Sequence, residues 1–178
     1  MTYDLGFYHS ALISKCSLFT SETFGLAKAA VLTKDRTVSG FLRYFETIGS
    51  GDTFSRMCIL DALILNTDRH SGNFGVLYQN DTMQVQKMAP VFDNNRSLLF
   101  DLDDDQLKNT EWCIQHCSPR LGVDFVATAR GLMTDAIRSD LENLQNFYFE
   151  QHPNIPAPQE RLDRLTKIVQ RQLREILA

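Results

Sequence analysis

The segment from Phe54 to Ile64 constrains the fold more than any other part of this 178-residue sequence. Apolar residues lie on nearly every side of the helix that this segment predicts, and Asp52 or Thr53 supplies a capping residue ahead of it. A helix of this kind is stable only when other elements cover all of its sides. We therefore expect a central buried helix, inside one domain with a full hydrophobic core.

The composition is that of an ordinary globular protein, with 43% hydrophobic and 22% charged residues. The formal net charge is −4, and the Lys and Arg residues are interspersed with acidic ones. A nucleic-acid-binding protein usually has a concentrated basic face, so we expect no direct nucleic-acid contact. No stretch resembles a signal peptide or a membrane span, and we expect a cytoplasmic protein with no membrane contact.

The order of the remaining predicted elements indicates the fold class. A polar stretch follows the buried helix, and then come two strands at residues 74–78 and 83–91, joined by a turn. We also expect a strand at 11–16 and helices at 22–32, 37–48, 104–116, 123–150 and 158–177. The prediction is a mainly α-helical bundle with a small β-hairpin, laid out like the large C-terminal lobe of a protein kinase.

Three residues in and after the polar stretch carry the chemistry that we expect. Asp68 and Asn73 are separated by the D-x-x-x-x-N spacing of a kinase catalytic loop. Asp93 follows at the end of the returning strand, and a hairpin would bring it back towards Asn73. Phosphoryl transfer from ATP needs a carboxylate near the attacking hydroxyl and oxygen ligands for Mg²⁺, and this set supplies both.

The sequence LNTDRHSGNFGVL, followed by MAPVFDNNRSLLF, resembles the HipA-like serine/threonine kinases. The stretches ISKCSLFTS and HPNIPAPQERLDRL are also similar to that family, so the resemblance spans about residues 11–178. The resemblance implies that Asp68 is the catalytic base and that Asn73 and Asp93 bind Mg²⁺, with ATP as the phosphoryl donor. A surface ion pair at Asp68 and a turn at Asp93 are the structural alternatives.

Four neighbouring residues are expected to support the loop. Asn66 and His70 match the family's loop and more often shape it than react. Asp61 lies two helical turns before Asp68, on the buried helix. A buried carboxylate needs a partner, and we expect a hydrogen bond from Arg69 or His70.

Two further groups could be mistaken for metal sites. Cys113, His116 and Cys117 could share a helical face, but no fourth ligand is near, and we expect free thiols. An acidic run, which we interpret as a solvated loop, contains Asp101, Asp103, Asp104 and Asp105.

The sequence departs from the family pattern in two places. Asn95 stands where the family usually has Gly two residues after the metal-binding Asp, and Asn tolerates the left-handed conformation that a Gly turn uses. In addition, Gly49-Ser50-Gly51 lacks the spacing of a phosphate-binding loop, and Lys15 is too close to Asp68 to be the small-lobe lysine. We therefore expect residues 1–50 to be a hinge or remnant segment, residues 51–178 to be the catalytic lobe, and the small lobe to be largely absent.

Three functions remain open from the sequence. The chain is the catalytic lobe of a protein kinase completed by a separate polypeptide, a catalytically silent protein-binding remnant, or a lipid or small-molecule kinase. The family resemblance also implies a toxin-like role and an antitoxin-like DNA-binding partner protein.

Overall fold

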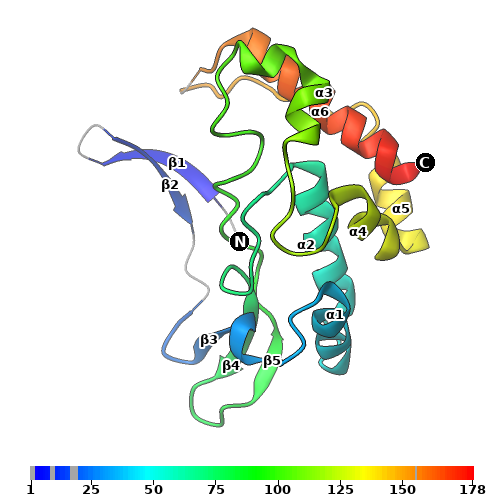
Figure 1. Cartoon of the computed structure of the whole chain (residues 1–178). Helices are drawn as coiled ribbons and strands as arrows, with labels where there is room; N and C mark the ends of the chain where they lie inside the picture. Colours follow the sequence, from blue (N-terminus) through cyan, green and yellow to red (C-terminus); the bar gives the residue numbers. More distant parts are fainter. Residues whose placement is uncertain (1–2, 9–10, 17–19, 155) are drawn as a thin grey trace. The chain divides into compact units, whose positions relative to one another are not determined.

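The computed structural model describes residues 3–8, 11–16, 20–154 and 156–178, the first two ranges by their backbone only. The chain forms two compact units. The first unit contains Met1–Gly51 and Ser71–Asp93, and the second contains Asp52–His70 and Asn94–Ala178. The elements of both units are labelled in Figure 1. Along the chain, residues 52–70 of the second unit therefore separate the two parts of the first. The polar stretch after the buried helix is divided between the units, because its residues up to His70 belong to the second unit and those from Ser71 onward belong to the first.

The first unit holds the β-structure of the described residues. Strands β1 (Tyr3–Tyr8) and β2 (Ala11–Cys16) form an antiparallel pair. A separate antiparallel sheet has the order β3-β4-β5, from β3 (Phe24–Lys28), β4 (Gly75–Gln79) and β5 (Val85–Met88). Gly75 permits the close approach of β3 to β4, because a Cβ at this position would lie 2.1 Å from the carbonyl oxygen of Ala27.

Aromatic side chains form the core of the first unit. Helix α1 (Val38–Thr47) begins at Thr37, whose side chain accepts a hydrogen bond from the Gly40 N–H. Phe41 and Phe45 on this helix are fully buried and contact the ring of Phe74, with ring centroids 5.0 and 6.1 Å apart. Phe74 directly precedes β4, so this contact fixes the end of the polar stretch to α1.

The second unit is helical and is organised around α2 (Gly51–Leu63). Three further helices are short, and each of them begins at a side-chain N-cap: Asn109 for α3 (Thr110–Gln115), Asp124 for α4 (Phe125–Gly131) and Thr134 for α5 (Asp135–Glu142). Such caps contribute about 1 kcal/mol each. They allow short helices to begin at defined residues.

Helix α6 (Gln159–Leu177) closes the second unit. Its buried face includes Leu165, Ile168, Leu173 and Ile176, and its Gln172 amide donates a hydrogen bond to the Ala62 carbonyl of α2 at 3.1 Å. The carbonyl of Leu177 accepts a hydrogen bond from Arg138 of α5 at 2.8 Å. The C-terminal helix is therefore fixed both to the buried helix and to α5 (Figure 1).

Some of the elements expected from the sequence are present in the structure, and others are replaced. The structure confirms a mostly helical chain, the buried helix, the helix at 37–48 and the strand at 11–16. The predicted helix at 22–32 is wrong, because β3 and a short 3-10 turn occupy that segment. The β-structure is consequently a three-stranded sheet plus a two-stranded antiparallel pair, which is more than the hairpin and the separate strand at 11–16 that we expected. The predicted helix at 123–150 is divided into α4 and α5.

No helix among the described residues has the length and apolar character needed to cross a membrane.

Candidate functional site

The loop that contains Asp68 starts from a well-defined end of α2. Leu65 adopts a left-handed conformation with φ of 51°, and the Asn66 N–H donates a hydrogen bond to the Asp61 carbonyl at 2.9 Å. This is the geometry of a Schellman C-cap, in which glycine usually takes the left-handed position. A leucine there costs about 1–2 kcal/mol. The surrounding contacts must compensate for that strain, and they fix where the loop leaves the helix.

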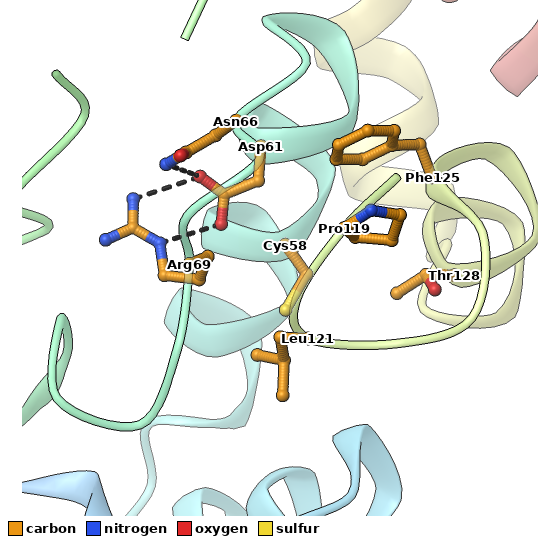
Figure 2. Close-up of a pocket in the computed structure, with 8 residues that line it drawn as sticks. All are labelled: Cys58, Asp61, Asn66, Arg69, Pro119, Leu121, Phe125 and Thr128. Atoms are coloured by element: carbon orange, nitrogen blue, oxygen red, sulfur yellow. Dashed lines mark hydrogen bonds and ion pairs between the residues drawn. The ribbon is translucent and has the colours of Figure 1, made fainter. Parts of the chain in front are cut away.

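A buried ion pair holds the base of this loop (Figure 2). Asp61 is 5% exposed and Arg69 is 1% exposed. The Arg69 guanidinium donates two hydrogen bonds to the Asp61 carboxylate, from Nε at 2.8 Å and from Nη2 at 3.0 Å. The side-chain amide of Asn66, which is fully buried, donates to the same carboxylate at 2.9 Å. We expected Arg69 or His70 as the partner of Asp61, and the structure shows Arg69 in this role.

The electrostatics of Asp61 reflect two opposing effects. Burial raises the pKa of its carboxyl, and the hydrogen bonds and charge of Arg69 lower it. The effect of burial is the larger, so the pKa lies above the ordinary value. The bidentate geometry and the third bond from Asn66 satisfy most acceptor sites of the carboxylate. Separating the two residues would leave an uncompensated charge in the interior. The pair therefore strongly constrains the local conformation.

The Arg69 guanidinium also contacts the segment that follows Asp93 in the chain. Arg69 Nη2 donates a hydrogen bond to the side-chain oxygen of Asn94. Two backbone hydrogen bonds lie beside it: from the Thr67 N–H to the Arg96 carbonyl at 3.2 Å, and from the Leu98 N–H to the Ile64 carbonyl at 2.7 Å. Two stretches about thirty residues apart in sequence are therefore joined within the second unit.

Asp68 lies at the exposed side of the loop. Its backbone N–H donates to the side-chain oxygen of Asn66 at 3.1 Å, and its side chain is 18% exposed. The carboxylate accepts a hydrogen bond from Arg120 at 2.6 Å. That hydrogen bond, with the charges of Arg120, His70 and Arg96, lowers the pKa of Asp68. Asp68 is therefore an ionised carboxylate at neutral pH, able to accept a hydrogen bond from a hydroxyl group.

Arg120 is a residue of the site that sequence reasoning missed. It lies between α3 and α4, and its neighbours Pro119 and Leu121 line the same small cavity as Asp61 and Arg69 (Figure 2). The space left among these side chains is about 10 Å³, room for no more than one water molecule. This packing positions Arg120 beside Asp68. No sequence signal marks an arginine 52 residues away as the partner of Asp68.

Asn73 and Asp93 belong to the first unit, whereas Asp68 belongs to the second. Asn73 is 6% exposed and lies two residues before β4. Asp93 is half-buried and has φ of 58°, a left-handed conformation that Asp tolerates better than most residues. The left-handed conformation that we considered for Asn95 is therefore found at Asp93, and Asn95 has no positive φ.

The acidic run at residues 101–105 has structural partners. Asp103 accepts a hydrogen bond from the Gln106 N–H at 2.8 Å, and Asp104 pairs with Arg161 at 2.8 Å. Among the described residues, no group of three or more His, Cys, Asp or Glu side chains is arranged to hold a metal ion.

Comparison with solved structures identifies the type of fold. The chain is similar to the crystal structure of a Helicobacter pylori proinflammatory kinase, CtkA, with a TM-score of 0.67 and 17% sequence identity. The match covers 98% of this chain and 73% of that chain. The fold is kinase-like. No protein-family model matches the chain, and no curated protein is significantly similar to it in sequence.

A kinase-like fold gives the loop after α2 a structural context. The end of α2 and the buried Asp61–Arg69 pair hold the loop in place. The loop presents the ionised carboxylate of Asp68 at its exposed side. A carboxylate held in this way suits accepting a hydrogen bond from a substrate hydroxyl and orienting it.

Proposed function

We propose that this chain transfers the γ-phosphoryl group of ATP to a Ser or Thr hydroxyl of a protein, as part of a HipA-like kinase. The observation that carries the proposal is the ionised, partly exposed carboxylate of Asp68 on a loop fixed by the buried Asp61–Arg69 pair. The likeness of the fold to a solved kinase supports it. In this proposal Asp68 orients the attacking hydroxyl and accepts its proton.

Asn73 and Asp93 are the proposed ligands of Mg²⁺. Their donor atoms, an amide oxygen and a carboxylate, are the hard oxygen ligands that Mg²⁺ prefers. Mg²⁺ bound there would neutralise charge on the ATP phosphates. Chain connectivity supports the assignment: Asp93 directly precedes Asn94, and Asn94 is hydrogen-bonded to Arg69, the residue after Asp68.

Arg69 has a central part in this scheme. Its guanidinium contacts Asp61, which orients the loop, and Asn94, which follows the proposed metal ligand. A single planar group therefore links the two chain segments that carry the proposed chemistry.

The test is a phosphoryl-transfer assay with the full chain together with the polypeptide that supplies its small lobe, Mg²⁺ and γ-labelled ATP, offering casein and lipid vesicles as alternative acceptors. We expect label on protein, and Asp68→Asn should lower turnover by roughly 10²–10⁴-fold while leaving ATP binding intact. Asp93→Asn should also weaken Mg²⁺-dependent ATP binding. Asp81→Asn is the matched control, because this exposed carboxylate in the turn between β4 and β5 has no assigned role.

Two outcomes would contradict the proposal. Label found only on lipid would exclude a protein acceptor. Equal loss of ATP binding in Asp68→Asn and Asp93→Asn would contradict the separate roles of base and metal ligand.

A second candidate is a protein-binding module without turnover. The Arg120 guanidinium already occupies one oxygen of the Asp68 carboxylate, as a resting or silent site would. A wild-type chain that labels no acceptor, while Arg120→Ala also labels none, would favour this candidate.

A further inference from the structure

A cavity of about 220 Å³ lies within the second unit and has no role in the function proposed above. Its lining comes from the loop after α2, from the segment that follows Asn94, and from α3 and the residues just beyond it. Thr67, one of the lining residues, directly precedes Asp68. The cavity therefore opens beside the loop that presents the proposed base.

Apolar and aromatic side chains form most of its surface. Leu65, Leu99 and Cys113 are buried in its lining. Trp112 stacks on His116, with ring centroids 4.1 Å apart and an interplanar angle of 32°. Burial raises the pKa of the Cys117 thiol to about 11, so this residue adds a neutral, weakly polar surface. Such a lining suits a flat apolar group.

Arg96 gives the cavity a cationic group, and Asp101 adds one carboxylate to the same lining. Its guanidinium lies 5.1 Å from the centroid of the Phe100 ring, and both residues are exposed. No carboxylate of the described residues lies within ion-pair distance of Arg96. Its charge also contributes to the lowered pKa of Asp68, so it lies within electrostatic reach of that carboxylate.

The size of the cavity limits what can occupy it. Pockets for free cofactors and drug-sized ligands usually measure about 300–1,000 Å³. A cavity of 220 Å³ is smaller than this range and has room for one large side chain. A side chain of a bound peptide reaches such a cavity while its backbone remains outside.

We propose that this cavity is a subsite for one aromatic side chain of a peptide substrate, with an acidic residue of the same peptide facing Arg96. The inference rests on the proposed protein-kinase function, because the subsite would place a nearby Ser or Thr hydroxyl at Asp68. It assigns a substrate class to the site: acidic peptides with an aromatic residue close to the acceptor hydroxyl.

The test uses intrinsic fluorescence, because Trp112 is the single tryptophan of the chain and lines the cavity. The full chain, without ATP, is titrated with three synthetic peptides that contain one acceptor Ser each. The first has Phe and Asp after the Ser, the second replaces the Phe by Ala, and the third replaces the Asp by Lys. We expect a saturable change in Trp112 emission with the first peptide, and binding roughly tenfold weaker for the other two.

Two arginine variants test the charge contribution. Arg96→Ala should remove the preference for Asp over Lys in the peptide. Arg43→Ala, which removes an exposed arginine on α1 in the first unit, should leave the preference unchanged. Equal affinities for all three peptides, or no change in Trp112 emission with any of them, would overturn the subsite.

The subsite and the reaction can fail separately. Peptide-dependent fluorescence without phosphoryl transfer would retain the subsite and refute the proposed reaction. Phosphoryl transfer to peptides without preference for the aromatic residue would retain the reaction and refute the subsite.

Discussion

Two ion pairs share the loop after α2, and they differ in their access to water. Asp61 and Arg69 are 5% and 1% exposed, whereas the side chains of Asp68 and Arg120 are 18% and 59% exposed. Asp68 and Arg69 are nevertheless adjacent in the sequence. We call Asp61–Arg69 the inner pair and Asp68–Arg120 the outer pair. Water screens the outer pair and not the inner one, so the inner pair fixes the conformation of the loop while the outer pair can exchange partners. The loop therefore has a rigid base and an adaptable exposed side.

The largest expected effect comes from breaking the inner pair. Arg69→Met leaves the Asp61 carboxylate buried without its cation, and we expect a loss of about 3–5 kcal/mol in the free energy of unfolding. Urea denaturation followed by circular dichroism measures it. Arg56→Met is the matched control, because Arg56 pairs with Asp52 and Asp140 at the surface, and it should cost about 1 kcal/mol or less. Similar losses in both variants would remove the distinction between the pairs.

A smaller effect is expected where the inner pair reaches the segment after Asp93. Asn94→Ala removes an acceptor of Arg69 and should cost about 1.5–3 kcal/mol, the usual value for a hydrogen bond to a charged group. It should also weaken Mg²⁺-dependent ATP binding, measured by calorimetry, because Asp93 loses its anchored neighbour. Asn95→Ala, at the exposed next position, is the control and should change neither quantity.

The outer pair should contribute little to stability. Arg120→Ala is expected to change the free energy of unfolding by about 1 kcal/mol or less. Arg120 lowers the pKa of Asp68 below its ordinary value of 3.8, so the contribution of the pair is present above pH 3.8. It is lost as the pH falls through the lower pKa of the folded state. Unfolding curves of wild type and Arg120→Ala should therefore converge in acid, and a difference that grows there would contradict the assignment.

The smallest expected effect is that of salt. Raising ionic strength from about 0.01 to 1 M shortens the Debye length from about 30 to 3 Å, which screens exposed charges. The stability difference between wild type and Arg120→Ala should shrink, and that between wild type and Arg69→Met should persist. Denaturation in urea measures both differences, since urea itself adds no ionic strength.

Short-range sequence patterns predicted several elements of this chain well. The apolar run from Phe54 to Ile64 indicated a buried helix, and α2 is buried along most of its length. The charged and apolar periodicity after Pro158 indicated an amphipathic helix, which is α6. In both cases the information lies within one segment, because helix periodicity is set by neighbours three and four residues apart.

The error at residues 22–32 has a physical cause. The segment is rich in Ala and Leu, which favour helix in isolation, yet Phe24–Lys28 pairs with β4 about fifty residues later. Backbone hydrogen bonds to a distant strand outweigh intrinsic helix propensity, which is worth only a few tenths of a kcal/mol per residue. Within 123–150, Thr134 could have indicated the start of a second helix, because Thr is a favoured N-cap.

The sequence by itself determined the residue types of the candidate site and their order. Asp61 lies on the apolar helix, Asp68 lies five residues before Asn73, and Asp93 follows the two strands. Only the tertiary structure decided the electrostatic partners, which are Arg69 for Asp61 and Arg120 for Asp68. The physical reason is that a charge interacts with whatever folding brings within a few ångströms, and sequence separation carries little information about that distance. The cavity beside Thr67 arises in the same way, from segments that meet only in the folded chain.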